Sequence, residues 1–486
     1  MVRSIPESER ILVFQGGGSL GAYEAGAYKG IYELLKKKDN SKSIYNKSTF
    51  DIIAGSSIGA INAAILTSHV IETGSYDGSA EKLIDFWHYL SKESMVEKNP
   101  FFEEWWNFWH SIYNHVASGE AARRYYSSKE FSLFGVPNVF TPMTPQSDTK
   151  FFDIQNTWYR FDIKPLKRSL ERFAKFPIAT EWEDGQPRLL LISVDVATSY
   201  QAVFDSYKRK DGTRCTEYGR HIRKHDGTTG FEYVIHYDEG ITSDHVIASA
   251  AFPVNFDYVN LNVQKYDVSQ GNQIISNETK IDKLESNEYK IQQRKFWDGG
   301  LMNNTPLMSA IQKHRDYWYY TRGIVNNIPS LGIAIVNLHP STQEEIPIDH
   351  DGVLNRNNDI TFSDRSITEE GYLLLISDYV DLVKQFIDLL IETGIKKEKI
   401  DSILDNKVRP HGMFSKIRTY RNIVEGRFNI TDVIRIERKN DEDTISNKTY
   451  DFSSKTINEL LKQGYFDSIE YAKRNQQDKN KDDISK

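Results

Sequence analysis

The stretch DIIAGSSIGAINAAIL, residues 51–66, decides which fold we expect for this chain. An apolar run from Phe50 to Ala54 enters the turn Gly55-Ser56-Ser57-Ile58-Gly59, and a helical pattern of small residues follows. G-x-S-x-G between a strand and a helix is typical of a sharp turn that exposes the serine, because side chains at the glycines would collide. Such a turn puts Ser57 at a helix N-terminus, where developing negative charge is stabilised. We therefore expect Ser57 to be a nucleophile; the alternative is a turn that only packs tightly.

An earlier stretch, ILVFQGGGSLGAYEAGAYKGIYELL at residues 11–35, has the same order of strand, glycine turn and helix. Here Gly16, Gly18 and Gly21 satisfy G-x-G-x-x-G, the dinucleotide-binding pattern. Asp39 lies near the distance expected for an acidic ribose ligand. A dinucleotide site would explain this turn but would leave the serine turn unexplained, whereas a hydrolase explains both.

A nucleophilic serine needs oxyanion donors and a base. Adjacent strand ends of a parallel sheet would place the Gly16–Gly18 turn beside Ser57, with its backbone N–H groups available as donors. The candidate base is Asp298 in KFWDGGLMNNTPL, residues 295–307. The alternative is an ordinary turn, since Asp and Gly both favour turns. No histidine occupies an obvious third position, and an Asp base with an ordinary pKa of about 3.9 would need burial to raise it.

Two successive strand–turn–helix units predict an α/β fold with a parallel sheet and crossover helices. Further continuous apolar runs, Leu189–Val196 and Leu331–Leu338, predict strands of a sheet that is covered on both faces. With 486 residues, 39% of them hydrophobic, the chain can bury one large core or two smaller ones.

We expect a catalytic region at residues 1–345, a helix-rich C-terminal region at 346–472 and a disordered charged tail at 473–486. The catalytic region contains an inserted helical segment, about residues 85–145, that carries four of the eight tryptophans. Its aromatic stretch Phe101–Trp109 is either a lid or acyl-chain surface over the site, or it packs into a small core of its own.

The C-terminal region shows three elements. Apolar residues at helical spacing predict a long amphipathic helix from about Thr368 to Thr393. The run ITDVIRIE, Ile430–Glu437, predicts a strand. The segment SSKTINELLKQGYFDSIEYA that follows predicts a closing helix with a serine available to cap it.

Composition narrows the class of protein. A formal net charge of -7 and a pI near 6.0 argue against a nucleic-acid partner, which would need a concentrated basic face. Cys215 is the single cysteine, so no intrachain disulfide can form, which fits a reducing compartment. The first residues lack a secretory signal, and no apolar run is long enough to span a bilayer. We expect a cytoplasmic protein, with peripheral membrane contact left open and no prediction of oligomeric state.

Together the motifs resemble those of the patatin-like phospholipases and lipid acyl hydrolases. The resemblance rests on four blocks in order over roughly residues 8 to 340: GGGSLGAYEAG, GSSIG, ASAAFPVNF at Ala248–Phe256, and DGGLMNNTPL, which is similar to a D-G-G-x-x-x-N-x-P pattern. The part after residue 345 is similar to a bacterial and archaeal subgroup with an extra C-terminal region of unknown function.

The resemblance implies a three-layer α/β/α fold and a catalytic dyad of Ser57 and Asp298, without cofactor, metal or histidine. The implied oxyanion donors are Gly16, Gly17 and Gly18, and the supporting motif glycines are Gly21, Gly55, Gly59, Gly299 and Gly300. Leu20 stands where many phospholipid-directed members carry Arg or Lys, so a phospholipid preference is not implied. The expected function is hydrolysis of lipid or other acyl esters through an acyl-serine intermediate. An acyltransferase with the same dyad, or a non-enzymatic lipid-binding scaffold, remains the alternative.

Overall fold

The computed structural model describes residues 3–41, 49–113, 117–143, 158–223, 229–266, 289–325, 327–408 and 419–484. Within these residues a mixed ten-stranded sheet forms the centre, in the order β12-β11-β1-β2-β5-β10-β9-β8-β7, with β6 paired to β5 off this path. The strands are β1 (Ser8–Phe14), β2 (Ile52–Gly55), β5 (Arg188–Asp195), β6 (Gln201–Asp205), β7 (Cys215–Arg223), β8 (Thr229–His236), β9 (Val259–Tyr266), β10 (Tyr289–Asp298), β11 (Ser330–Asn337) and β12 (Ile430–Glu437).

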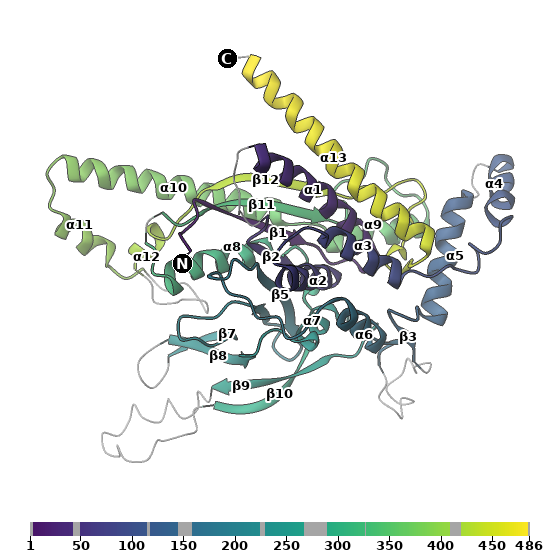
Figure 1. The fold of residues 1–486 in the computed structure, drawn as a ribbon, viewed down its shortest axis with the longest axis horizontal. Helices are drawn as coiled ribbons and strands as arrows, with labels where there is room; N and C mark the ends of the chain where they lie inside the picture. The colour runs from purple at the N-terminus through teal and green to yellow at the C-terminus, as the bar shows by residue number, and fades with distance from the viewer. Residues whose placement is uncertain are drawn as a thin grey trace.

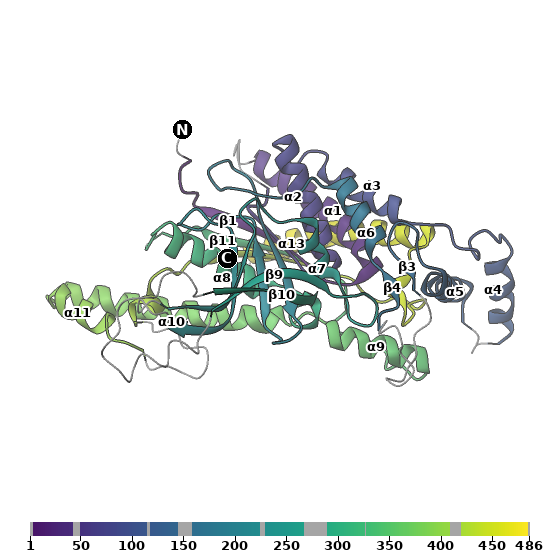
Figure 2. The same cartoon turned by 90° about the horizontal axis from the view of Figure 1, so that it is seen from below.

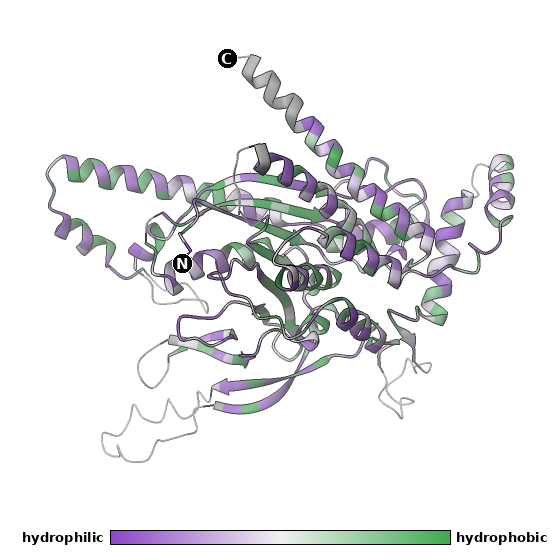
Figure 3. Ribbon diagram, viewed as in Figure 1, coloured by the Kyte–Doolittle hydropathy of each residue, from purple (hydrophilic) through white to green (hydrophobic). Residues whose placement is uncertain are grey.

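The strands from β12 to β5 run parallel, and those from β5 through β10 to β7 pair antiparallel. The runs predicted as buried strands form β5 and β11, all but wholly buried along their length. The predicted α/β class with a mostly parallel central sheet is confirmed. The antiparallel part carries more polar residues, and β9 and β10 are largely hydrophilic in Figure 3.

Helices cover both faces of the sheet, which gives the predicted three layers (Figure 1). Successive residues of β1 point to opposite faces. Leu12 and Phe14 belong to the core under α1 (Gly21–Ser41) and α2 (Ile58–Thr73). Ile11 and Val13 belong to the core on the other face, under α8 (Leu307–Asp316). Figure 2 shows α1 and α2 on one side of the sheet and α10 (Ser366–Glu392) on the other.

The C-terminal region is part of this layered body. The predicted strand Ile430–Glu437 and the predicted long helix are both present, as β12 and α10. β12 extends the parallel sheet beside β11, and α13 (Ser454–Ile484) lies along α1. The contact between α1 and α13 is close because both helices bring glycine to it: a Cβ on Gly30 would lie 2.6 Å from Ser468 Cβ, and one on Gly464 would lie 2.7 Å from Ala27 N. α13 runs to Ile484, so its last turns include residues for which composition predicts disorder.

The inserted segment is helical, as predicted, with α3 (Ser79–Leu90), α4 (Phe102–Ile112) and α5 (Gly119–Phe134). α3 packs into the main core, whereas no residue of α4 is buried. Figure 1 shows α4 at the edge of the molecule, attached through α5.

The remaining elements connect these layers. They are β3 (Thr141–Pro142), β4 (Phe161–Asp162), α6 (Lys164–Phe173), α7 (Ser243–Ala250), α9 (His350–Phe362), α11 (Lys397–Leu404) and α12 (Arg421–Val424). In the described part of the chain, no helix combines the length and the apolar character that crossing a bilayer requires.

Candidate active site

The serine turn has the strained geometry that its sequence predicts. Ser57 follows β2 and caps α2 with φ +55° and ψ −125°, a backbone conformation that costs a non-glycine residue free energy. The glycines on either side are required by close approach. A Cβ on Gly59 would lie 2.7 Å from the carbonyl oxygen of Phe14, and one on Gly55 would overlap the backbone of Gly59. Packing against the ends of β1 and β2 maintains this strained conformation. The turn thereby exposes the Ser57 hydroxyl at the end of the sheet.

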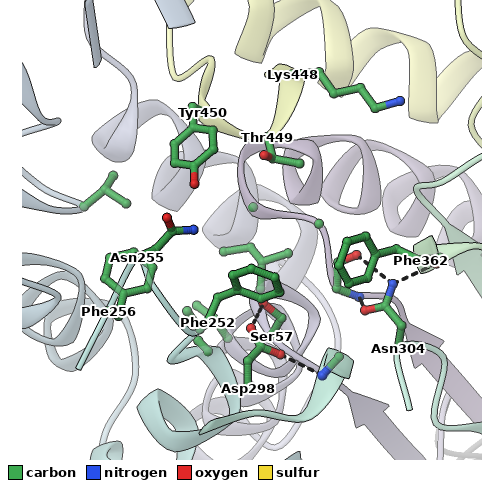
Figure 4. A pocket seen from close by; sticks show the side chains of 18 of the residues that line it. Ser57, Phe252, Asn255, Phe256, Asp298, Asn304, Phe362, Lys448, Thr449 and Tyr450 are labelled. Atoms are coloured by element: carbon green, nitrogen blue, oxygen red, sulfur yellow. Dashed lines mark hydrogen bonds between the residues drawn. The ribbon is translucent and has the colours of Figure 1, made fainter. Parts of the chain in front are cut away.

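Asp298 meets this hydroxyl from another strand. It is the last residue of β10, and Ser57 Oγ donates to Asp298 Oδ2 at 2.5 Å. The second carboxylate oxygen, Oδ1, accepts from the backbone N–H of Gly300 at 2.7 Å. Gly299 lies against the backbone of Ile192 in β5, where a side chain would not fit. The D-G-G turn therefore fixes the orientation of the carboxyl group toward Ser57 (Figure 4).

The environment of Asp298 changes its acidity. Its side chain is fully buried, and burial raises the pKa to about 7, although the hydrogen bonds from Ser57 and from Gly300 act in the opposite direction. At neutral pH both the acid and the carboxylate are then populated. A carboxyl group in this state can accept the Ser57 proton and return it, which an ordinary aspartate does poorly at that pH.

The glycine turn lies against the serine, but its three N–H groups are not equivalent. The N–H of Gly16 donates to the backbone oxygen of Asn304 at 3.2 Å and to Asn304 Oδ1 at 3.1 Å. Those of Gly17 and Gly18 have no acceptor among the described residues, and both residues line the cavity at Ser57. Gly18 has φ +58°, which favours glycine. The turn thus leaves two N–H groups available to a ligand and uses the third to hold its position.

Two polar side chains that our sequence analysis did not single out support this turn. Asn304 also donates from Nδ2 to the oxygen of Gly16 at 3.2 Å. Gln15 Oε1 accepts from the N–H groups of Leu338 and His339, so it connects the end of β1 to the end of β11. Asn304 is the asparagine of the D-G-G-x-x-x-N-x-P pattern, and that pattern was a signal from which its role could have been found.

Gly21, the last glycine of the G-x-G-x-x-G pattern, has a packing role. A Cβ there would lie 2.7 Å from both Ile58 and Trp87. Asp39 lies at the other end of α1, where its two oxygens accept from Arg10 at 2.6 and 2.7 Å. Asp39 is therefore not placed to bind a ribose beside the turn. The dinucleotide alternative is left with the glycine pattern alone as its support.

A cavity of about 280 Å³ opens from the dyad, and most of its walls are apolar. The lining residues are Gly16, Gly17, Gly18, Ser57, Ile58, Ile61, Val139, Phe140, Leu166, Ala250, Phe252, Asn255, Phe256, Asp298, Gly300, Asn304, His339, Asn358, Phe362, Ser446, Lys448, Thr449, Tyr450 and Phe452. The aromatic stretch Phe101–Trp109 is absent from these walls. Within it, Phe102 and Trp106 are half-buried and pack against each other and against Tyr126 of α5.

Part of this wall comes from the C-terminal region, for which the sequence suggested no contribution to the site. Figure 4 shows Thr449 and Tyr450 above the dyad and Phe362 beside Asn304. Ser19 Oγ donates to the oxygen of Lys448 at 2.8 Å, and a Cβ on Gly18 would lie 2.6 Å from the oxygen of Thr449. Residues 448–449 of the C-terminal region therefore pack directly against the glycine turn.

Histidine and metal ligands are not gathered at the dyad. His339 borders the cavity, but its Nδ1 lies 3.2 Å from Asp359, and burial lowers its pKa. His245 contacts Thr242 at the start of α7. Across the described ranges, no group of three or more His, Cys, Asp or Glu side chains could hold a metal ion.

An α/β/α body with a strand–serine–helix turn, an aspartate in hydrogen-bonding contact and a glycine turn beside it defines a protein of the acyl hydrolase class. The sequence matches the family described as Patatin-like phospholipase over residues 12–311, and the chain belongs to this family. The family indicates lipid acyl hydrolase activity in general. No curated protein matches the chain significantly.

Among solved structures, the crystal structure of VipD from Legionella pneumophila is similar over 96% of this chain and 67% of that chain, at 10% identity and a TM-score of 0.27. A similarity of this strength supports no conclusion about function. The match to the family ends at residue 311, so the family does not account for the C-terminal wall of the cavity.

Proposed function

We propose that this chain is a serine acyl hydrolase that cleaves carboxylic esters of lipids through a dyad of Ser57 and Asp298. The observation that carries the proposal is the 2.5 Å hydrogen bond from Ser57 Oγ to a buried carboxyl group whose pKa is raised to about 7. The strained backbone of Ser57 and the burial of Asp298 both cost free energy of folding. The arrangement therefore does not serve stability, which supports a catalytic role.

The reaction begins when ionised Asp298 accepts the proton of Ser57 Oγ as this oxygen attacks the ester carbonyl. The electron pair of the carbonyl moves to its oxygen, and the N–H groups of Gly17 and Gly18 donate to the oxyanion. The positive end of α2 stabilises the same charge. Collapse of the intermediate expels the alcohol, which takes the proton from Asp298, and leaves an acyl-serine.

In the second half, Asp298 accepts a proton from water as the water attacks the acyl-serine. The same oxyanion donors act again, and the carboxylic acid leaves as Ser57 recovers its proton. An acyltransferase would use the same residues, with an alcohol or thiol in place of water. The apolar cavity supports an acyl chain as the group held during this step, because apolar walls favour apolar ligands.

The test is hydrolysis of p-nitrophenyl esters from short to long acyl chains by native protein, Ser57→Ala and Ser56→Ala. Ser56 is the matched control, since its buried Oγ has no hydrogen-bond partner among the described residues and lies one residue from the nucleophile. We expect Ser57→Ala to lose turnover and Ser56→Ala to keep it, and mass spectrometry should detect a trapped acyl group on Ser57. Equal activity of native protein and Ser57→Ala would overturn the dyad.

We also propose that the protein works in the cytoplasm and contacts lipid surfaces from outside the bilayer. Two observations support this proposal. Cys215 is a free, buried thiol, and α4 exposes Trp105, Phe108 and Trp109, side chains that suit a membrane interface. Co-sedimentation with phosphatidylcholine vesicles tests the contact, and Trp105→Ala with Trp109→Ala should reduce the bound fraction. Unchanged sedimentation would refute it.

A further inference from the structure

A second cavity lies between Leu20, α5 and the C-terminal region. It has a volume of about 260 Å³. Its lining includes Leu20 and the charged residues Arg124, Arg438, Asp441, Lys448, Asp451 and Glu459. Lys448 borders this cavity and the cavity at Ser57, and in Figure 4 its amino group points away from the dyad. Leu20 belongs to the turn that follows Gly18, so the two cavities are neighbours.

Arg438 lines this cavity with a guanidinium group that forms no ion pair with the described residues. The residue is 2% exposed, and its Nη1 donates to Asn440 Oδ1 at 3.0 Å. Among the described residues, its buried Nε has no hydrogen-bond partner and no carboxylate forms an ion pair with the guanidinium. Burial lowers the pKa of Arg438, although the nearby charges of Asp359 and Asp441 act in the opposite direction. A buried cation that is neither paired nor fully hydrogen-bonded is strongly unfavourable, so the site is incomplete without a negative group.

Lys448 supplies a second buried cation to the same place. Its Nζ donates to Asn440 Oδ1 at 3.0 Å, the atom that Arg438 also contacts, and to Asp359 Oδ1 at 2.6 Å. Burial and the positive charge of Arg438 lower the pKa of Lys448 to about 7. Asp359 in turn accepts from Asn440 and contacts His339. Among the described residues Asp359 therefore pairs with Lys448 and forms no ion pair with Arg438.

The other carboxylates around the cavity are committed elsewhere. Asp441 accepts from Arg124 Nη1 with both oxygens at 3.0 Å, and Glu459 lies 3.4 Å from the same guanidinium. Burial raises the pKa of Glu459 and that of Asp451, which shifts both toward the neutral acid. None of the three hydrogen-bonds Arg438, so these groups leave the guanidinium open to a ligand.

We propose that this cavity is a binding site for a phosphate group, held by Arg438 and Lys448. A phosphate has several oxygens, so one can accept from the free Nε of the guanidinium while another accepts from the ammonium group. The source is either the phosphate of a lipid whose acyl chain lies in the neighbouring cavity or a free phosphate compound. The lipid source rests on the proposed hydrolase function; the binding site itself does not.

The experiment measures the thermal unfolding of Ser57→Ala protein in millimolar inorganic phosphate against sodium chloride of equal ionic strength. Phosphate also stabilises proteins nonspecifically, so the comparison between variants carries the result. We expect a specific rise in Tm of about 1–2 °C that Arg438→Gln and, separately, Lys448→Met abolish. The matched control is Arg315→Gln, because Arg315 donates to the backbone oxygens of Asn422 and Gly426 outside this cavity.

An equal rise in all variants, or no rise in the Ser57→Ala protein, would overturn the site. If Arg438→Gln fails to fold, Lys448→Met decides the question. The Ser57→Ala background keeps this readout independent of turnover, so a failure of the hydrolase proposal would be seen separately. A second experiment identifies the source of the phosphate. It compares the hydrolysis of phosphatidylcholine vesicles with that of diacylglycerol vesicles by protein that retains Ser57. A phospholipid preference lost in Arg438→Gln supports a lipid head group; an unchanged preference with lost phosphate stabilisation supports a free phosphate compound.

Discussion

The two walls of the Ser57 cavity are built in different ways. The wall formed by the serine, glycine and D-G-G turns is made of backbone in close contact, with Gly16 so near Ser57 that a Cβ would lie 2.8 Å from the serine Cβ. The facing wall from the C-terminal region presents large side chains, Phe362, Tyr450 and Phe452. Backbone contacts fix positions that chemistry requires, whereas side chains set the size of the space beside them. Under the proposed function, we therefore expect the first wall to set reactivity and the second to set the fit of the acyl chain.

The largest expected effect tests the wall of turns. Asp298→Asn should lower kcat by about 10³–10⁴-fold, because the amide cannot accept the Ser57 proton. The same change should stabilise the protein at alkaline pH. The pKa of Asp298 is raised above its unfolded value, so ionisation destabilises the fold as pH rises from about 4 through 7, by on the order of 4 kcal/mol in full.

Thermal unfolding at pH 5 and pH 8, with p-nitrophenyl ester hydrolysis alongside, measures both effects. Ser56→Ala is the control for a nearby substitution. A variant that loses activity and is less stable than native protein at pH 8 would contradict the assignment, because its loss would then come from damaged structure.

Gly18→Ala should have the next largest effect. Gly18 has φ +58°, and its added Cβ would lie 2.6 Å from the oxygen of Thr449, so the turn must move. Displacing one oxyanion donor should reduce kcat by about 10²-fold. Gly212→Ala is a matched control, because Gly212 has φ +84° with open space around it and tests backbone strain alone. Equal losses of kcat in both variants would show that strain, and not the oxyanion donor, explains the result.

The sequence predicted the wall of turns better than the C-terminal wall, and the reason is physical. The Gly16–Gly18 turn was predicted beside Ser57 because the ends of neighbouring strands meet, and the resemblance to the family implied Asp298 as the partner of Ser57; the structure places the three together. Each of the three turns is a short motif whose steric demands are encoded by its own glycines. The roles of these residues in catalysis stay a prediction until the variants are measured.

The C-terminal wall escaped prediction because it depends on contacts between distant residues. The elements of this region were predicted, but Ile430–Glu437 gives no sign that its partner is β11, about a hundred residues earlier. Nor does the sequence indicate that Ser19 will hold the oxygen of Lys448. β12 pairs with β11 and α13 packs against α1. The segment between β12 and α13 therefore passes over the glycine turn.

Activity should increase with pH, by a moderate factor. Asp298 must be ionised to accept the proton, so kcat/KM should rise with pH about tenfold per unit below a pKa of about 7 and level off above it. Measurement between pH 5 and 9 with a short ester tests this, and Ser56→Ala should reproduce the native profile. A rate that is flat from pH 5 to 9 would mean that Asp298 is ionised throughout and that burial does not set its acidity.

The smallest expected effect tests the C-terminal wall. Tyr450→Ala and Phe362→Ala each remove a side chain that lines the cavity, so a long acyl chain should lose contacts worth about two methylene groups. The ratio of kcat/KM for a long ester to that for a short ester should then fall about tenfold. Tyr372→Ala on α10, where the side chain is 62% exposed, is the control and should leave the ratio unchanged. If both cavity variants lower kcat for every chain length equally, the wall acts on the glycine turn through Thr449, and the division between reactivity and fit would have to be abandoned.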